Sequence, residues 1–399
     1  MQCMASASPR IAFVTPRYGP DIVGGAETLC RLIAENLAAN GIATHVLTTC
    51  ARDHFTWRNE LPVGDYVENH VAVRRFAVSP NREQARWLEL HGRIQRRQEV
   101  GYSQQLEWMA HSVWSEQLLE AAGDTAQYDW IIGIPYLFGT AFWSVARRPG
   151  RACLIPCLHD EPHAWTSVVE HMLRGVRGCL LNSVGESELL ERVAPGTDWR
   201  LVGVGYDARP LPQAEAIAAF CRARGISPGF VLYAGRREIA KNVPLLFSHY
   251  AAYRRAHPEA PPLALMGSGE LAVPPEIAPH VIELGYVPQE DVATAFAAAD
   301  VLVHPSHLES LGMVVLEAWL AGTPALVNAS SAVLKQHCET SNGGLWFTDQ
   351  DEFCFALEQI LGDPSLRTSL ARNGARYTLD AFSWKAVRQR LLSALDEWA

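Results

Sequence analysis

The stretch His304–Val327 reads HPSHLESLGMVVLEAWLAGTPALV. It begins at the end of an apolar run, continues through a polar loop into a segment with helical character, and ends in a second apolar run. A strand, a loop, a helix, a turn and a strand in this order form the βαβ unit of a parallel sheet. The stretch therefore predicts an α/β fold, and it directs the search for chemistry to the loops that follow strands.

The same alternation of apolar runs and helical segments extends along the rest of the chain. The candidate strands begin at Ile11, His45, Val71, Asp129, Ala152 and Gly178 in the first half, and at Phe230, Pro262, His280, Asp300 and Pro324 in the second. This pattern predicts two Rossmann-like, doubly wound domains that face an interdomain cleft. The proline-containing segment GYDARPLP marks the boundary, so residues 1–207 and 208–383 are the two expected domains. The helical segment 384–399 is expected to pack back on the first domain.

Composition excludes several classes of protein. A chain of 399 residues with a net charge of −9 offers no large positive field for a nucleic acid. The chain contains no apolar run long enough for a membrane span and no apolar segment typical of a secretory signal at its start, so a cytoplasmic location is expected. Its nine cysteines form no CxxC pair with a matching partner. We expect reduced thiols, no structural metal and no cofactor.

Two carboxylates stand out in the opening stretch. Glu317 is the charged residue of an otherwise apolar helical segment, and Glu309 lies in the preceding loop. A buried carboxylate needs hydrogen-bond donors, which a ribose diol would supply, although Glu317 can equally lie on the solvated stripe of an amphipathic helix. Between the two carboxylates lies a helix N-terminus, where the backbone amides near Leu311, Gly312 and Met313 favour an anion such as a diphosphate.

A second group of charged residues follows the strand FVLYAG, in the segment GRREIAKNVPLLF. Arg236 comes directly after the strand and Lys241 follows in the same loop, although only three of the 34 basic residues of the chain are lysines. An arginine and a lysine together can neutralise a diphosphate. The alternative interpretation is a solvated helix start that carries two unrelated cations. GRREIAK lacks the second glycine and the Ser or Thr of a P-loop, and a GxGxxG dinucleotide fingerprint is absent after the first strand.

Taken together, these motifs resemble the large GT4 group of retaining GT-B glycosyltransferases over nearly the whole chain. The segment from Glu309 to Glu317 is similar to the E-x7-E signature of that family, and GRREIAK is similar to its G-R-x4-K block. The segments MGSGE, LGYVP, AADVLVHPS and LEAWLAGTPALV follow in the family's order. Two features of the first half also resemble the family, namely the pair Gly24 and Gly25 before a helix that starts near Ala26, and His159 after the strand ACLIP.

The resemblance implies a metal-independent transferase that uses a nucleotide-diphosphate sugar, for example a UDP or GDP conjugate, as its donor. Glu317 would hold the ribose and Glu309 the sugar hydroxyls, while Arg236 and Lys241 would stabilise the departing diphosphate. His159 would contact the sugar near its anomeric centre, although a lone histidine is more often structural. The remaining donor contacts that the resemblance implies are Gly24, Gly25, Val287, Ser310, Leu311 and Gly312.

The acceptor is not identified by these motifs, and a glycan, a lipid-linked molecule or a small-molecule hydroxyl is compatible with them. From Arg74 to Arg97 the chain carries seven arginines against two acidic residues. This arginine-rich stretch is either a solvated helix face or a peripheral contact with an anionic membrane. Two other functions are compatible with the same fold, a nucleotide-sugar epimerase and a catalytically inactive, nucleotide-sugar-binding partner subunit.

Overall fold

The computed structural model describes residues 9–399 and divides the chain into two compact units. Unit 1 is the chain up to Gly205 together with Trp384–Ala399, and unit 2 is Tyr206–Ser383. The division falls two residues before the position expected from the prolines. Tyr206 belongs to unit 2 because its amide donates to Phe382 O at 2.7 Å and because it forms a β-bridge with Ser383.

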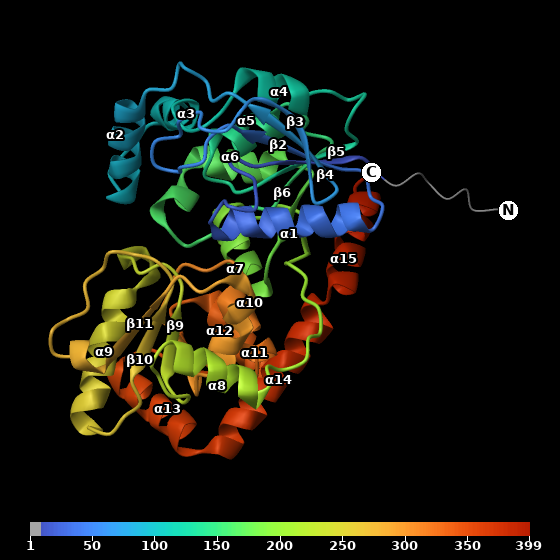
Figure 1. The fold of residues 1–399 in the computed structure, drawn as a ribbon. Helices are drawn as coiled ribbons and strands as arrows, with labels where there is room; N and C mark the ends of the chain where they lie inside the picture. The colour runs from blue at the N-terminus through green and yellow to red at the C-terminus, as the bar shows by residue number, and fades with distance from the viewer. Residues whose placement is uncertain (1–8) are drawn as a thin grey trace. The chain divides into compact units, whose positions relative to one another are not determined.

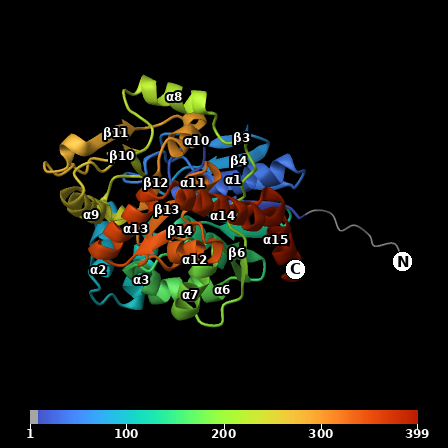
Figure 2. The same cartoon turned by 90° about the horizontal axis from the view of Figure 1, so that it is seen from below.

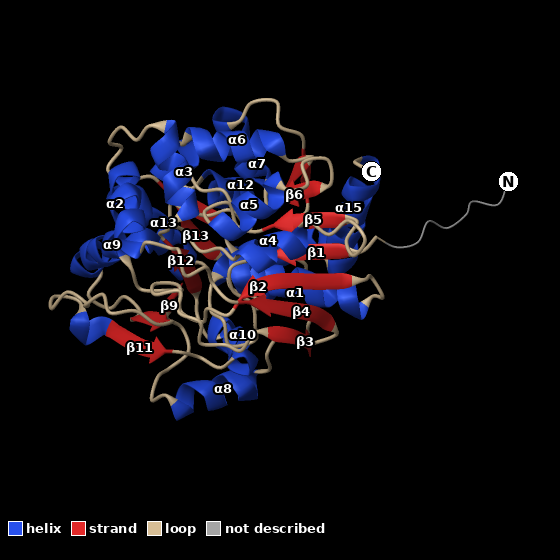
Figure 3. Cartoon of the chain, turned by 90° about the horizontal axis from the view of Figure 1, so that it is seen from above, coloured by secondary structure: helices blue, strands red, loops and turns tan. Residues whose placement is uncertain are grey.

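The sheet of unit 1 has the strand order β3-β4-β2-β1-β5-β6-β7-β8. Its strands are β1 (Ile11–Val14), β2 (Thr44–Thr49), β3 (Gly64–Glu68), β4 (Val71–Phe76), β5 (Trp130–Gly133), β6 (Ala152–Leu154), β7 (Gly178–Leu181) and β8 (Trp199–Leu201). The pairings are parallel except at the β3 edge, where β3 is antiparallel to β4 (Figure 3). The sequence analysis predicted no strand over Gly64–Glu68, so this antiparallel pairing was missed. Asn69 and His70, both at positive φ, form a two-residue turn, which can join only antiparallel strands.

Helices pack around this sheet (Figure 1). They are α1 (Gly25–Ala39), α2 (Gln84–Gln95), α3 (Tyr102–Ala110), α4 (Glu116–Ala122), α5 (Gly139–Ala146), η1 (Pro162–Trp165), α6 (Ser167–Gly175), α7 (Val184–Val193) and α15 (Trp384–Glu397). The last of these, α15, packs against β8. Trp398, just after α15, donates from its indole nitrogen to Asp198 Oδ2 at 2.8 Å, which joins the end of the chain to unit 1.

The sheet of unit 2 is parallel, with the order β11-β10-β9-β12-β13-β14. Its strands are β9 (Val231–Ala234), β10 (Leu263–Met266), β11 (Val281–Gly285), β12 (Val301–His304), β13 (Ala325–Asn328) and β14 (Gly344–Phe347). Every residue of β9, β10, β12 and β13 is buried. Burial on both faces explains why these strands are continuous apolar runs in the sequence rather than alternating ones.

The helices of unit 2 complete its layers. They are α8 (Ala214–Ala223), η2 (Ile239–Lys241), α9 (Val243–Ala256), η3 (Ala278–His280), α10 (Gln289–Ala297), α11 (Met313–Leu320), α12 (Ala332–Ser341), α13 (Gln350–Gly362) and α14 (Pro364–Phe382). The long helix α14 packs against α11 (Figure 2). The fully buried Trp319 of α11 lies edge-on to Tyr377 of α14, and this contact fixes the helix that carries Glu317.

None of the helices within residues 9–399 has both the length and the apolar character needed to cross a bilayer. Eight cysteines in this part of the chain are free thiols, and the ninth, Cys3, lies outside the described residues, as does most of the N-terminal segment considered above for a signal. Cys153 in β6 and Cys157 are both buried. Burial raises the pKa of both thiols, so they remain protonated at neutral pH.

Candidate functional site

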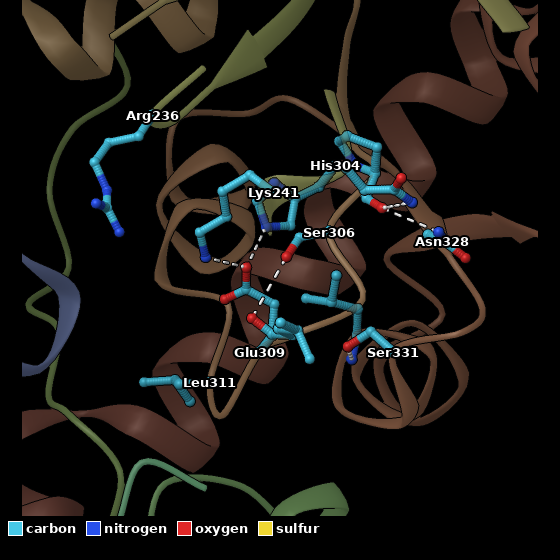
Figure 4. Close-up of polar contacts among 12 residues, drawn as sticks. Arg236, Lys241, His304, Ser306, Glu309, Leu311, Asn328 and Ser331 are labelled. Atoms are coloured by element: carbon cyan, nitrogen blue, oxygen red, sulfur yellow. Dashed lines mark hydrogen bonds and ion pairs between the residues drawn. The ribbon is translucent and has the colours of Figure 1, made fainter. Parts of the chain in front are cut away.

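The carboxyl ends of β9 and β12 bring two of the predicted charged residues together. β9 and β12 are adjacent parallel strands, so the loops that follow them emerge at the same edge of the sheet. Lys241 ends the short helix η2 after β9, and Glu309 lies in the loop after β12. Lys241 Nζ lies 2.7 Å from Glu309 Oε1 (Figure 4). Two motifs predicted to bind different parts of one ligand are therefore in direct contact.

Glu309 is the centre of this cluster. Its side chain is 11% exposed, and its Oε1 atom also lies 3.0 Å from Nε2 of His304. Burial by itself raises the pKa of Glu309, but the Lys241 ammonium and the His304 imidazole outweigh this effect and hold the pKa well below its usual range. Glu309 is therefore a carboxylate at neutral pH, able to accept hydrogen bonds from hydroxyl groups.

His304 was given no role by the sequence analysis, although it opens the quoted stretch. It is the last residue of β12 and its side chain is buried. Nε2 contacts Glu309, whereas Nδ1 has no hydrogen-bond partner within residues 9–399. The signal that could have identified His304 is its position, because a polar residue that ends a buried parallel strand lies at the edge where such sheets bind ligands.

The loop that carries Glu309 is held by side chains from neighbouring segments. Asn328, at the end of β13, donates from Nδ2 to Pro305 O at 3.0 Å. Asn242, which follows Lys241, donates from Nδ2 to the same carbonyl at 3.2 Å. Figure 4 shows His304, Ser306 and Asn328 around this turn. The cluster is thus pre-organised by side-chain hydrogen bonds to the backbone of the loop, without a ligand.

Gly312 ends the same loop and caps α11. Its φ of 73° lies in the left-handed region, and a Cβ atom at this position would lie 2.4 Å from Leu334 Cδ2. The preceding Leu311 is buried, and its carbonyl oxygen lies 2.9 Å from His337 Nε2. These constraints place the N-terminus of α11, which starts at Met313, immediately after the Glu309 loop. Ser310 lies between Glu309 and Leu311 in the same loop.

Arg236 is not part of the Lys241–Glu309 contact. Its guanidinium forms an ion pair with Glu238 at 3.1 Å, and its side chain is 48% exposed. Figure 4 shows Arg236 to one side of Lys241 and Glu309, with no contact drawn to either. The backbone of Arg236 is fixed, because its carbonyl accepts a hydrogen bond from the buried Tyr233 hydroxyl at 2.7 Å. An exposed ion pair is weak, so an anionic ligand can compete with Glu238 for the guanidinium.

Glu317 lies in α11, where its side chain is partly buried. Burial raises the pKa of Glu317 to about 7, and the nearby Arg209 offsets this effect only in part. No side chain within residues 9–399 donates a hydrogen bond to its carboxylate. A partly buried, unpaired carboxylate is available to an incoming diol, as the sequence analysis expected for a ribose.

Val287 follows β11 in a region where three loops touch. Its side chain is buried, whereas the neighbouring Tyr286 is 79% exposed. Gly267, after β10, donates from its amide to Gly285 O at 2.7 Å. A Cβ atom on Gly267 would lie 2.2 Å from Gly235 O, so the loops after β9, β10 and β11 meet backbone to backbone. The first glycine in MGSGE is explained by this close approach.

Gly24 and Gly25 belong to unit 1, at the start of α1. The helix begins at Gly25, one residue earlier than expected, and a Cβ atom on Gly24 would lie 2.1 Å from Glu27 Oε2. Glu27 in turn pairs with Arg17, whose Nε lies 3.0 Å from Glu27 Oε1. Arg17 also donates to Arg52 O at 3.0 Å. This buried pair, which the sequence analysis missed, shapes the glycine-containing loop.

His159 also belongs to unit 1, in the loop after β6, and its side chain is 30% exposed. Its Nδ1 lies 3.7 Å from Glu161 Oε1, which accepts a hydrogen bond from the Tyr136 hydroxyl at 2.7 Å. Burial raises the pKa of Glu161, but His159, His163 and Tyr136 outweigh it and lower the pKa. Glu161, another residue that the sequence analysis missed, is thus a carboxylate that orients the His159 imidazole.

The arginine-rich stretch of unit 1 is partly neutralised within the fold. Arg74 pairs with Asp65, Arg75 with Glu68, and Arg86 with both Glu89 and Glu107. Several of the charges that suggested an anionic membrane surface are therefore balanced by acidic residues, some of which are distant in the sequence.

Comparisons with known proteins agree with this architecture. Residues 224–377 match the family model described as Glycosyl transferases group 1. An uncharacterized glycosyltransferase of Methanocaldococcus jannaschii is 25% identical over 407 residues, covering 96% of this chain and 97% of that protein. D-inositol 3-phosphate glycosyltransferase of Saccharomonospora viridis is 28% identical over 321 residues, covering 70% and 72% of the two chains. The structure of sucrose-phosphate synthase from Thermosynechococcus elongatus superposes with a TM-score of 0.75 at 20% identity, covering 98% of this chain and 99% of the other, and shows the GT-B fold.

Proposed function

We propose that this chain, which the comparisons support as a group 1 glycosyltransferase, transfers a sugar from a nucleoside-diphosphate donor to an acceptor hydroxyl with retention of anomeric configuration. The observation that carries the proposal is the buried contact of Glu309 with Lys241 and His304, next to the N-terminus of α11. A carboxylate, an ammonium group and a helix N-terminus together provide acceptors for sugar hydroxyls and positive charge for a diphosphate. The epimerase and the inactive partner subunit are not favoured by the comparisons, which name glycosyltransferases and a synthase.

In the proposed reaction the bond between the anomeric carbon and the diphosphate oxygen breaks, and its electron pair leaves with the diphosphate. A new bond forms between the anomeric carbon and the acceptor oxygen, and the acceptor proton passes to a diphosphate oxygen. Lys241 and Arg236 oppose the negative charge that grows on the leaving group, which lowers the barrier without a metal ion. Glu309 accepts hydrogen bonds from the transferred sugar, and Glu317 accepts them from the ribose.

The binding step is tested by thermal stabilisation with UDP, GDP, ADP and their hexose conjugates. A ligand bound only by the folded state raises the melting temperature, so one nucleotide of the series is expected to stabilise the protein selectively. Lys241→Ala and Glu317→Ala are expected to weaken this shift. The matched control is Lys335→Ala on α12, whose ammonium faces Glu339 at 3.5 Å and which should retain the full shift. Absence of a shift with every nucleotide would contradict the proposal.

The chemical step is tested by following the donor with and without candidate acceptors. Transfer requires an acceptor-dependent glycoside product whose anomeric configuration, read by NMR coupling constants, is that of the donor. His159→Ala is expected to lower kcat and to leave the nucleotide-induced shift unchanged. Conversion of the donor to an epimer in the absence of acceptor would replace the proposal with the epimerase, and an inverted product would remove the retaining mechanism.

A further inference from the structure

Unit 1 contains a surface pocket that none of the proposed donor residues lines. It lies between the loop that follows α2 and the short helix η1, three residues after His159. The buried side chains of Ile94 and Val100 contribute an apolar part of its lining. Arg97, Gln98 and Trp165 also line it, and all three are exposed. The pocket thus combines an apolar surface with a cation, an amide and an indole ring.

Trp165 is 42% exposed, which is unusual for so large an apolar side chain, and it is held in one orientation. Its indole nitrogen donates to Asp160 Oδ1 at 2.8 Å. Asp160 forms an ion pair with Arg192 at 3.1 Å, and the Arg192 guanidinium lies 4.9 Å from the centre of the Trp165 ring. A fixed, exposed indole is a flat apolar surface of the kind on which the C–H face of a sugar ring packs.

Arg97 is the cation of the pocket. Its φ is 54°, in the left-handed region that residues other than glycine seldom occupy. The amide of Arg97 donates to Ile94 O at 2.8 Å, and the next amide donates to Arg93 O at 2.9 Å, so the turn is hydrogen-bonded. Within residues 9–399 the Arg97 guanidinium forms no ion pair, unlike Arg74 and Arg86 of the same stretch. An unpaired guanidinium at a pocket is suited to a carboxylate or a phosphate.

Contacts between α2, η1 and neighbouring segments hold the walls of the pocket together. His91 of α2 stacks on His163 of η1 with ring centroids 4.1 Å apart. Burial, reinforced by His163, lowers the pKa of His91 to about 4, so its ring is neutral at neutral pH. Gln105 has both ends of its amide occupied, donating to Val100 O at 2.8 Å and accepting from Val168 N at 3.0 Å. Thr166, which also lines the pocket, donates from its hydroxyl to His163 O at 2.9 Å. Arg97 and Gln98 are exposed, so their polar groups are accessible to a ligand.

We propose that this pocket binds the acceptor of the reaction, and that the acceptor is a saccharide carrying a phosphate or a carboxylate. The sugar ring packs on Trp165, the anionic group pairs with Arg97, and Gln98 hydrogen-bonds a hydroxyl. The identification of this ligand as the acceptor rests on the proposed function. The binding of an anionic saccharide, in contrast, is a property of unit 1 that can be measured by itself.

The test uses the full chain and three probes, glucose 6-phosphate, glucuronate and uncharged methyl glucoside, with binding measured by titration in saturation-transfer NMR. At least one anionic probe is expected to bind at least fivefold more tightly than methyl glucoside. Comparison of the two anionic probes distinguishes a phosphate from a carboxylate. Trp165→Leu should weaken all three probes, and Arg97→Gln should abolish the preference for the anionic ones. The matched control is Arg96→Gln, because Arg96 is an exposed neighbour that does not line the pocket.

Any one of three outcomes overturns the inference. The first is that no probe binds the unmodified protein, and the second is that Trp165→Leu binds all probes as tightly as the unmodified protein does. The third is that Arg96→Gln reduces the preference for anionic probes as much as Arg97→Gln. Each variant is also assayed for its nucleotide-induced thermal shift, which reports that the chain is folded and that unit 2 binds its ligand. If no probe binds but the nucleotide-induced thermal shift is intact, the pocket is rejected as a saccharide site and the proposed function stands. Probe binding without any nucleotide shift supports a saccharide site and rejects the proposed function.

Discussion

Lys241 Nζ lies 2.7 Å from Glu309 Oε1, although 68 positions separate the two residues in the chain. The contact follows from the pairing of β9 with β12, which places the loops after both strands at one edge of the sheet. Glu309 is 11% exposed and Lys241 is 26% exposed, so water screens the pair only in part. The pair is therefore a structural element as well as a feature of the proposed site.

Replacement of Lys241 by Met is expected to destabilise the protein. The change leaves Glu309 buried with His304 as its remaining partner, and an incompletely compensated buried charge costs roughly 1 to 3 kcal/mol. The free energy of unfolding in urea measures the effect. Lys335→Met, which removes a partly exposed lysine, should change it by less than about 0.5 kcal/mol. Equal effects of the two variants would show that the Lys241–Glu309 contact does not contribute.

Replacement of His304 by Phe is expected to lower kcat/KM about 10- to 150-fold, which corresponds to one lost hydrogen bond to a charged group. Phe preserves the ring in the buried position and removes the Nε2 contact with Glu309. Steady-state kinetics with the donor identified by thermal shift provide the measurement. His249→Phe is the control, since His249 is also a buried histidine of unit 2 but packs on Phe347 and Phe353. Unchanged kinetics in His304→Phe would contradict a positioning role.

Stability is expected to depend on pH through Glu317, whose pKa is raised from 4.5 to about 7 in the folded protein. A raised pKa means that the folded state binds the proton more tightly than the unfolded state. The contribution of protonated Glu317 to the stability of the folded protein is therefore fully present below about pH 4.5, and it is lost as the pH rises through about 7. Glu317→Gln cannot ionise, so its stability relative to the unmodified protein should increase between pH 5 and pH 8.

Urea unfolding at the two pH values tests this expectation. Glu358→Gln, which replaces an exposed carboxylate on α13, should show no comparable change between them. If the difference in unfolding free energy between Glu317→Gln and the unmodified protein is the same at both pH values, Glu317 is more solvated than its place in α11 indicates.

Replacement of Gly312 by Ala is expected to destabilise the protein more than the same change at Gly225. Both glycines have left-handed backbones, with φ of 73° and 64°, so both variants incur the conformational cost of about 1 kcal/mol. Only at Gly312 does the new Cβ meet a neighbour, at 2.4 Å from Leu334 Cδ2, whereas the space around Gly225 is open. The difference in unfolding free energy isolates that contact. Similar values for the two variants would mean that Leu334 moves aside at little cost.

Turnover is expected to persist in EDTA, with a change of less than about twofold, because in the proposed mechanism Arg236 and Lys241 provide the positive charge for the leaving diphosphate. Arg236→Ala is expected to lower kcat by about 100- to 1,000-fold, the range found when one preorganised donor is removed. Arg237→Ala is the matched control, since the neighbouring Arg237 pairs with Glu283 at 2.7 Å. Loss of activity in EDTA that added Mg²⁺ restores would contradict the metal-independent mechanism.

Several strands that the sequence predicted, such as β9, β10, β12 and β13, are apolar runs with both faces buried, whereas β4 and β11 were predicted although part of each is exposed. β4 coincides with the run VAVRRF, and β12 lies within DVLVHP. β3, β8 and β14 were missed. The sequence of β3 is GDYVE, a partly exposed edge strand with no continuous apolar run, and β8 is only three residues long. Such strands form because a neighbouring strand offers unpaired backbone groups, which is information that a local pattern does not contain.

The sequence by itself determined the α/β pattern and the family motifs, and it singled out Glu309, Glu317, Arg236 and Lys241, because residue type and spacing are local properties. Only the tertiary structure decided which of these residues meet. It paired Lys241 with Glu309, directed Arg236 to Glu238, and added His304 to the cluster. The Lys241–Glu309 contact joins the loops that follow two adjacent strands, so it exists only once the sheet has placed these distant segments at one edge.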